Sequence, residues 1–207
     1  MNPDFIAQRQ KFMAATLARF HVSEEAFAAV TELLAPLAVP FRARKGEYLQ
    51  RAGQPALTVF WISSGVVRCG FLNREGAAVT LRFFMAGEGA AAQTDLLAGE
   101  SGVPAVQFLV AETPIEGFYL DWQQTCQLRA RHEVLRHYHL GVTEYGLQRQ
   151  VQHAYSHGET SASERLAAFR AEYPGLERQI SQRAMASYLG ITPQYMSRLL
   201  REHALTA

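Results

Sequence analysis

The chain has 207 residues, of which 48% are apolar and 19% are charged, and its formal net charge is +1. This is the composition of a folded protein of one or two domains with enough apolar residues for a buried core. A balanced charge gives no general attraction to nucleic acid, so binding of DNA would need a local basic patch. The first residues include charges, unlike a signal peptide, and no stretch approaches the roughly 20 apolar residues of a membrane helix. We therefore expect a cytoplasmic protein without membrane contact.

The first 40 residues predict two helices. Apolar side chains three and four positions apart indicate a helix over 6–20. Ser23, followed by two glutamates, is typical of a helix N-terminus, and Pro36 and Pro40 would end this second helix.

From Val39 to about Leu120, short β-rich runs alternate with turn residues. The clearest runs are 58–62, 66–72 and 79–84. Tight turns between strands favour glycine because its φ can be positive, and glycines recur through this region at Gly46, Gly53, Gly65, Gly76 and Gly87. Strands of about five residues, spaced roughly 8–12 residues apart, predict a small antiparallel barrel or roll.

Helical patterning returns after Asp121, a residue suited to cap a helix. The helix is expected to end near Tyr155, and one of its sides carries a stripe with 3-4-3 spacing: Leu135, Tyr138, Val142 and Tyr145. This stripe can either pack on the core of the same chain or form the seam of a dimer.

Residues 157–161 are polar and typical of a linker. A further helix is predicted from about Ser163 to Tyr173.

Residues 179–202 carry the most specific pattern, two helices joined by a tight turn. Ser181 is placed to cap the first helix, and Gly190 to end it with a positive φ. Ile191 would anchor the turn in the core. Thr192 is placed to cap the second helix, and Pro193 takes its first position, where a missing N–H costs nothing. The inward positions are apolar: Ala184, Met185, Leu189, Met196, Leu199 and Leu200.

This pattern predicts a DNA-binding helix-turn-helix. The N-terminal part of a recognition helix meets base edges, so Gln194 and Arg198 are the predicted base readers. The other residues expected at the DNA, several of them at phosphates, are Ser181, Gln182, Thr192, Tyr195, Ser197 and Arg201. From Arg178 onward four arginines and one glutamate give a local charge of +3. The alternative is a helical hairpin with solvated arginines.

Several motifs resemble the Crp–Fnr family of transcription regulators, and together they span nearly the whole chain. They are 45–49, the hairpin 60–68, the run 80–84 with Gly87-Glu88, and 186–193 with Ser197-Arg198-Leu199. The resemblance implies a β-roll like a cyclic-nucleotide-binding domain, a long dimer helix, and a C-terminal DNA-binding domain. It also implies a homodimer on a palindromic double-stranded operator. Only six residues follow Arg201, too few for the two-stranded wing that the family often has.

The segment that matches the family's cyclic-nucleotide cassette departs from its pattern. Ala91-Ala92 stand about where the family has Gly-Glu, and Pro104-Ala105 about where it has Arg-Ser. A phosphate would lack its bidentate arginine, so we expect no dependence on cAMP or cGMP. Either an unknown small-molecule effector or an empty scaffold fits this region. The candidate effector pocket consists of Ala91, Ala92, Gln93, Thr94, Pro104, Ala105 and Gln150.

Other cofactor-based sensors and enzymes are not expected. Two distant cysteines, Cys69 and Cys126, do not supply the four ligands of an iron–sulfur cluster. No histidine lies between His21 and His132, which removes the usual haem ligand and the ligands of a cupin-type metal oxygenase from the roll. Cys69 as an axial thiolate is a remote alternative. We therefore predict no cofactor, no metal and no enzyme activity.

His153 and His157 are four residues apart on the long helix. They are expected on a solvated face, with a metal-binding or pH-sensing role as the alternative.

These observations predict an α+β fold in three parts. Residues 1–120 would form an antiparallel β-roll (a jelly roll of the cyclic-nucleotide-binding type) with flanking helices. Residues 121–156 would form the dimerisation helix, and 157–207 the helix-turn-helix domain. The predicted function is a dimeric regulator of transcription. The alternative is a ligand-sensing or protein-interaction module whose helix-turn-helix is vestigial.

Overall fold

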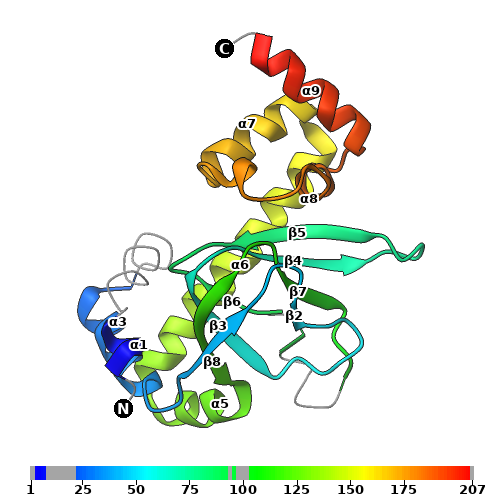
Figure 1. Ribbon diagram of the computed structural model, residues 1–207. Helices are drawn as coiled ribbons and strands as arrows, with labels where there is room; N and C mark the ends of the chain where they lie inside the picture. Colours follow the sequence, from blue (N-terminus) through cyan, green and yellow to red (C-terminus); the bar gives the residue numbers. More distant parts are fainter. Residues whose placement is uncertain (1–2, 8–21, 93–94, 97–102, 206–207) are drawn as a thin grey trace.

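The computed structural model describes residues 3–7, 22–92, 95–96 and 103–205. Two four-stranded antiparallel sheets pack face to face (Figure 1). One sheet has the order β1 (Val39–Ala43), β8 (Ile115–Asp121), β3 (Thr58–Ser64), β6 (Gly89–Ala90). The other has the order β2 (Tyr48–Gln50), β7 (Gln107–Ala111), β4 (Val67–Leu72), β5 (Ala78–Phe84). The predicted antiparallel roll is confirmed.

Residues of alternating burial from both sheets form the core of the roll. Ile62 of β3, Val67 of β4 and Leu109 of β7 are fully buried in the same apolar cluster. All five glycines expected in turns have a positive φ. Gly65 is the most constrained, because a Cβ at this position would lie 2.2 Å from the carbonyl oxygen of Pro114.

Among the residues described before the first strand, two helices pack on the roll: α1 (Pro3–Ala7) and α3 (Glu24–Leu34). Ser23 caps α3 as predicted, since its hydroxyl accepts from the N–H of Ala26 at 3.2 Å. Most of the helix predicted over 6–20 lies outside the described residues. Phe5 and Phe27 are fully buried and both contact the ring of Trp61 on β3, which fixes these helices to the sheet.

The helical region after the roll begins at the predicted cap, Asp121, but it is broken once and ends later than predicted. Asp121 caps α5 (Trp122–Arg131), and a break at His132 separates α5 from α6 (Glu133–Glu159). The helix thus runs four residues past Tyr155, and the linker predicted over 157–161 is wrong for its first three residues. The Thr160 hydroxyl donates to the carbonyl of Ser156 at 2.7 Å. At the C-terminus of α6, polar side chains therefore bond the free carbonyl groups of the last helical turn, and the helix continues through them.

The apolar stripe predicted on the long helix packs on the chain's own roll. Leu135 is buried, and Tyr138, Val142 and Tyr145 border the same cavity as Trp61 and Phe84 of the roll. Of the two alternatives left open by the sequence, core packing is correct for this stripe. None of the described helices is long and apolar enough to cross a membrane.

Three helices make up the C-terminal unit: α7 (Ala162–Glu172), α8 (Gln182–Tyr188) and α9 (Pro193–Leu205). A short 3-10 turn, Leu176–Arg178, connects α7 to α8. Ser161 and Glu164 form a reciprocal capping box at the start of α7. In Figure 1 this unit stands at one end of the roll, above β4 and β5.

Candidate nucleic-acid interface

The α8–turn–α9 unit has the geometry that its sequence predicted. The Ser181 hydroxyl accepts from the N–H of Ala184 at 3.1 Å, and the Thr192 hydroxyl from the N–H of Tyr195 at 3.1 Å. Gly190 has φ +65. The N–H of Gly190 donates to Ser187 O and the N–H of Ile191 to Ala186 O, the two bonds of a Schellman motif. The turn is therefore fixed by backbone hydrogen bonds.

Apolar packing holds the two helices at a fixed angle. Met196 and Leu199 of α9 are buried together with Met185 and Leu189 of α8 in one cluster, and Ile191 packs against it from the turn. Both caps and this packing depend on local sequence, which is why the prediction holds here.

The eight predicted DNA contacts lie at the N-terminus of α8 and along α9. Six of them are exposed: Ser181, Gln182, Thr192, Gln194, Arg198 and Arg201. Tyr195 and Ser197 are half-buried. The Ser197 hydroxyl lies 3.3 Å from Gln182 Oε1, which connects α9 to α8. The Arg198 guanidinium stacks 4.7 Å from the centre of the Tyr195 ring. Its ion pair with Glu202 spans 4.0 Å between exposed side chains, so it restrains Arg198 little.

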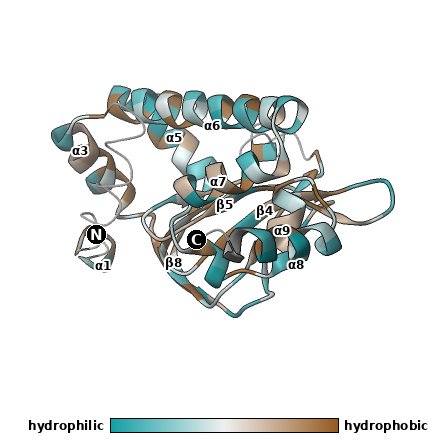
Figure 2. Ribbon diagram, turned by 90° about the horizontal axis from the view of Figure 1, so that it is seen from above, coloured by the Kyte–Doolittle hydropathy of each residue, from teal (hydrophilic) through white to brown (hydrophobic). Residues whose placement is uncertain are grey.

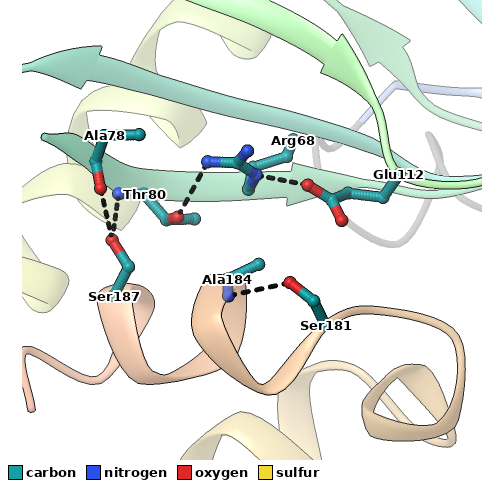
Figure 3. Close-up of polar contacts among 7 residues, drawn as sticks. All are labelled: Arg68, Ala78, Thr80, Glu112, Ser181, Ala184 and Ser187. Atoms are coloured by element: carbon teal, nitrogen blue, oxygen red, sulfur yellow. Dashed lines mark hydrogen bonds and ion pairs between the residues drawn. The ribbon is translucent and has the colours of Figure 1, made fainter. Parts of the chain in front are cut away.

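The other side of α8 docks on the edge strand of the roll, a contact that sequence reasoning missed. The Ser187 hydroxyl accepts from the N–H of Thr80 at 2.8 Å and donates to the carbonyl of Ala78 at 3.1 Å (Figure 3). β5 ends its sheet, so one side chain satisfies two backbone groups of an open edge. On the neighbouring strand β4, Arg68 forms an ion pair with Glu112, and its guanidinium also lies near the Thr80 hydroxyl (Figure 3).

Aromatic packing extends this docking. Phe83 of β5 is fully buried, and its ring centre lies 5.7–6.1 Å from those of Phe169, Tyr173 and Tyr188. The roll and the C-terminal helices therefore share one apolar cluster. The docking leaves the outer face of α9 exposed.

A polar cluster lies where α6 meets α7 and α8. Arg149 of α6 forms an ion pair with Glu172 of α7, and the Tyr188 hydroxyl donates to the same carboxylate at 3.0 Å. The centre of the His153 ring lies 4.3 Å from that of His157 and 4.6 Å from that of Tyr188, with the rings tilted to one another. The expectation of a solvated face holds for His157, which is exposed, and is wrong for His153, because α8 covers it. Among the described residues, no three metal-ligating side chains come together.

This environment predicts acid sensitivity. Burial, followed by the charges of His157 and Arg149, lowers the pKa of His153 to about 4, and burial lowers that of His139 to about 4. An unfolded histidine titrates near 6.5, so protonation favours the unfolded chain as the pH falls from about 6.5 to 4. We expect His153→Gln to reduce the stability lost between about pH 7 and about pH 5 by about 1 kcal/mol, allowing for solvent screening.

Urea unfolding of both proteins at the two pH values measures this difference. His137→Gln, a change at an exposed histidine of the same helix, should leave the loss unaltered. Equal losses in wild type and His153→Gln would contradict the assignment.

The predicted effector residues are only partly brought together. Ala91 and Gln150 border one cavity of about 240 Å³ between β5 and α6, together with Arg82, Gln107 and Arg149. Ala92 and Ala105 instead pack in an apolar cluster with Leu96 and Trp122, and Pro104 is exposed. Gln93 and Thr94 lie outside the described residues. Cys69 also borders this cavity, and burial raises its pKa to about 12, so it is a thiol rather than a thiolate at neutral pH.

Comparisons with models of protein families and with curated proteins found no match to this sequence. Solved structures do match. FixK2 from Bradyrhizobium japonicum has a TM-score of 0.68 at 22% identity, over 82% of this chain and 85% of its own. The c-di-GMP responsive global regulator CLP from Xanthomonas campestris has a TM-score of 0.66 at 16% identity, over 86% and 92%. A transcriptional regulator of the crp/fnr family from Eubacterium rectale has a TM-score of 0.68 at 14% identity, over 90% and 85%.

Proposed function

Because the chain has the fold of the Crp–Fnr regulators, we propose that it is a DNA-binding regulator of transcription that acts as a homodimer. The observation that carries the proposal is the exposed outer face of α9, with Gln194 and Arg198 one turn apart near its N-terminus. Residues 157–207 would bind DNA, 1–120 would sense a signal, and 121–156 would hold the dimer together. The protein would act by binding and not as an enzyme.

The outer face of α6 supports the dimer. Four large apolar side chains there are 54–68% exposed: Leu140, Leu147, Val151 and Tyr155. Their spacing of seven, four and four residues aligns them along one side of the helix, roughly opposite the stripe that packs on the roll. In Figure 2 no other described element covers the side of α6 that faces away from the roll. A second copy of the same helix would cover it, and a two-fold axis would set the recognition helices about 34 Å apart on a palindromic site.

Independence of cAMP is proposed on the charge of the cavity beside Ala91. A cyclic phosphate needs an uncompensated arginine; of the two that border this cavity, Arg149 is paired with Glu172 and the Arg82 guanidinium is held over the rings of Phe84 and Tyr145. Selection of binding sites from a random pool of duplexes tests both parts of the proposal. We expect a palindrome to be enriched without ligand and equally with cAMP; c-di-GMP is added as a third arm because CLP responds to it. Enrichment only with a nucleotide would contradict independence, and none in any arm would favour a vestigial helix-turn-helix.

Base reading predicts the effect of altering Arg198. Loss of one bidentate contact to guanine costs about 1–3 kcal/mol, so Arg198→Ala should weaken binding to the selected duplex by about 5–150-fold. Arg198→Lys keeps the charge but not the planar fork, and should lose most of the preference for the selected site over random DNA. Fluorescence anisotropy at fixed salt measures both.

Arg74, at the exposed tip of the β4–β5 hairpin, supplies the matched control. Arg74→Ala removes the same charge far from α9 and should leave the preference for the selected site unchanged. If Arg198→Lys and Arg74→Ala behave alike, Arg198 does not read a base.

A further inference from the structure

A second cavity lies between the roll, α5 and the first half of α6. It encloses about 100 Å³ and has walls from Trp61, Phe84, Leu120 and Val142. Of the predicted effector residues it touches only Ala91, and it adjoins the cavity that Gln150 borders, with which it shares Arg82 and Phe84. The residues that border it include two arginines and no aspartate or glutamate.

One polar group beside this cavity has no partner. Trp122, the first residue of α5, is 3% exposed, and its indole N–H makes no hydrogen bond within the described part of the chain. Leaving a buried donor unsatisfied costs about 1–3 kcal/mol. An acceptor from a bound molecule would remove this cost, and Trp122 borders the cavity.

A half-buried positive charge lies next to that donor. The Arg129 guanidinium stacks 5.0 Å from the centre of the Trp122 ring, reaches the His139 ring at 3.1 Å and donates to the Cys126 sulfur at 3.4 Å. The His139 ring carries no charge at neutral pH, because burial and the Arg129 charge lower its pKa to about 4. No described carboxylate pairs with Arg129. A cation in this position favours an anion as its missing counter-charge.

We propose that this cavity binds a small organic monocarboxylate with an apolar body. The carboxylate would accept from Arg129 and from the Trp122 N–H, and the apolar body would lie among the aromatic and aliphatic walls. An engineered apolar cavity of about 150 Å³ holds benzene, so a cavity of about 100 Å³ admits an apolar body smaller than one ring. The inference concerns ligand binding alone and does not depend on DNA binding.

Both tryptophans of the chain, Trp61 and Trp122, border the cavity, so the intrinsic fluorescence of the full-length protein reports on it directly. Propionate and butyrate serve as probes at constant ionic strength, with 1-butanol as the uncharged analogue and 2-naphthoate as the oversized carboxylate. We expect a saturable change with at least one of the two small carboxylates. The better of these should bind at least about tenfold tighter than 1-butanol, and 2-naphthoate should not bind. Equal affinity for butyrate and 1-butanol, or no saturation by either small carboxylate below about 10 mM, would overturn the proposal.

Variants at two arginines of α5 test whether Arg129 is the residue that binds the carboxylate. Arg129→Gln should weaken carboxylate binding at least about tenfold, whereas Arg131→Gln, at an exposed position on the same helix, should not. Trp122→Phe keeps the ring, removes the donor and leaves Trp61 as reporter, and should weaken binding about fivefold. Equal binding by the Arg129 and Arg131 variants would overturn the assignment. The comparison of charged and uncharged probes uses the unchanged protein, so the test holds even if a variant fails to fold.

Discussion

Replacing Phe83 with alanine is expected to lower the free energy of unfolding by about 3–5 kcal/mol, the largest effect of any single change considered for this fold. Phe83 is fully buried, and its ring contacts Phe169, Tyr173 and Tyr188, which belong to the C-terminal helices. The substitution removes a large apolar side chain and leaves a cavity between two parts of the molecule. The roll and the C-terminal unit would both lose packing.

Urea unfolding, followed by circular dichroism and by tryptophan fluorescence, measures this loss. Both tryptophans lie in or beside the roll, so fluorescence reports on that part, whereas circular dichroism also reports on the C-terminal helices. We expect coincident transitions in the wild type and separated transitions in Phe83→Ala. Leu72→Ala on the same hairpin, where the side chain is half exposed, should change stability by less than about 0.5 kcal/mol. A loss below about 1 kcal/mol for Phe83→Ala would mean that the docking does not contribute to cooperative folding.

Features set by local sequence could be predicted. The caps at Ser23, Ser181 and Thr192 and the left-handed Gly190 all depend on residues within four positions. The same is true of the strand runs and their turn glycines. The helix-turn-helix was therefore predictable almost residue by residue, since each of its signals is independent of the rest of the fold.

Contacts across the chain could not be predicted. The Ser187 hydroxyl bonds a strand edge 107 residues earlier in the sequence, and nothing near Ser187 marks it as a docking residue. His153 was expected in solvent because periodicity describes one helix alone, while Tyr188 of another helix covers it. The orphaned indole of Trp122 likewise becomes visible only when α5, α6 and the roll are placed together.

The long helix illustrates the limit most clearly. The 3-4-3 stripe that includes Leu135 and Tyr145 fits a dimer seam and a core face equally well, and only its contacts with the roll decide between them. The face of α6 that carries this stripe packs on the roll and is not available to a second chain. Leu140, Leu147 and Val151 lie on the other side of α6, where they are exposed and outside this chain's own core. We therefore place the proposed dimer contact on that side.

Introducing a charge at the centre of that face is therefore expected to abolish the dimer. In a two-fold pair of α6 helices, Leu147→Glu would bury two carboxylates in an apolar seam, at several kcal/mol for each, and raise the dimer dissociation constant at least about 100-fold. Leu147 is 63% exposed in the single chain, so the fold itself should survive. Sedimentation velocity at micromolar concentration measures the outcome.

Gln152→Glu adds the same charge at an exposed position on the same helix but outside the stripe, and should leave the dimer intact. Loss of the dimer should also change DNA binding, because a monomer presents one recognition helix to a duplex and a dimer presents two. Leu147→Glu should thus lose its preference for a complete palindrome over a single half-site, while Arg198 continues to read each half-site. A Leu147→Glu protein that stays dimeric, or a wild type that is monomeric at the same concentration, would show that α6 does not form the seam. The spacing of the recognition helices would then have to come from another surface.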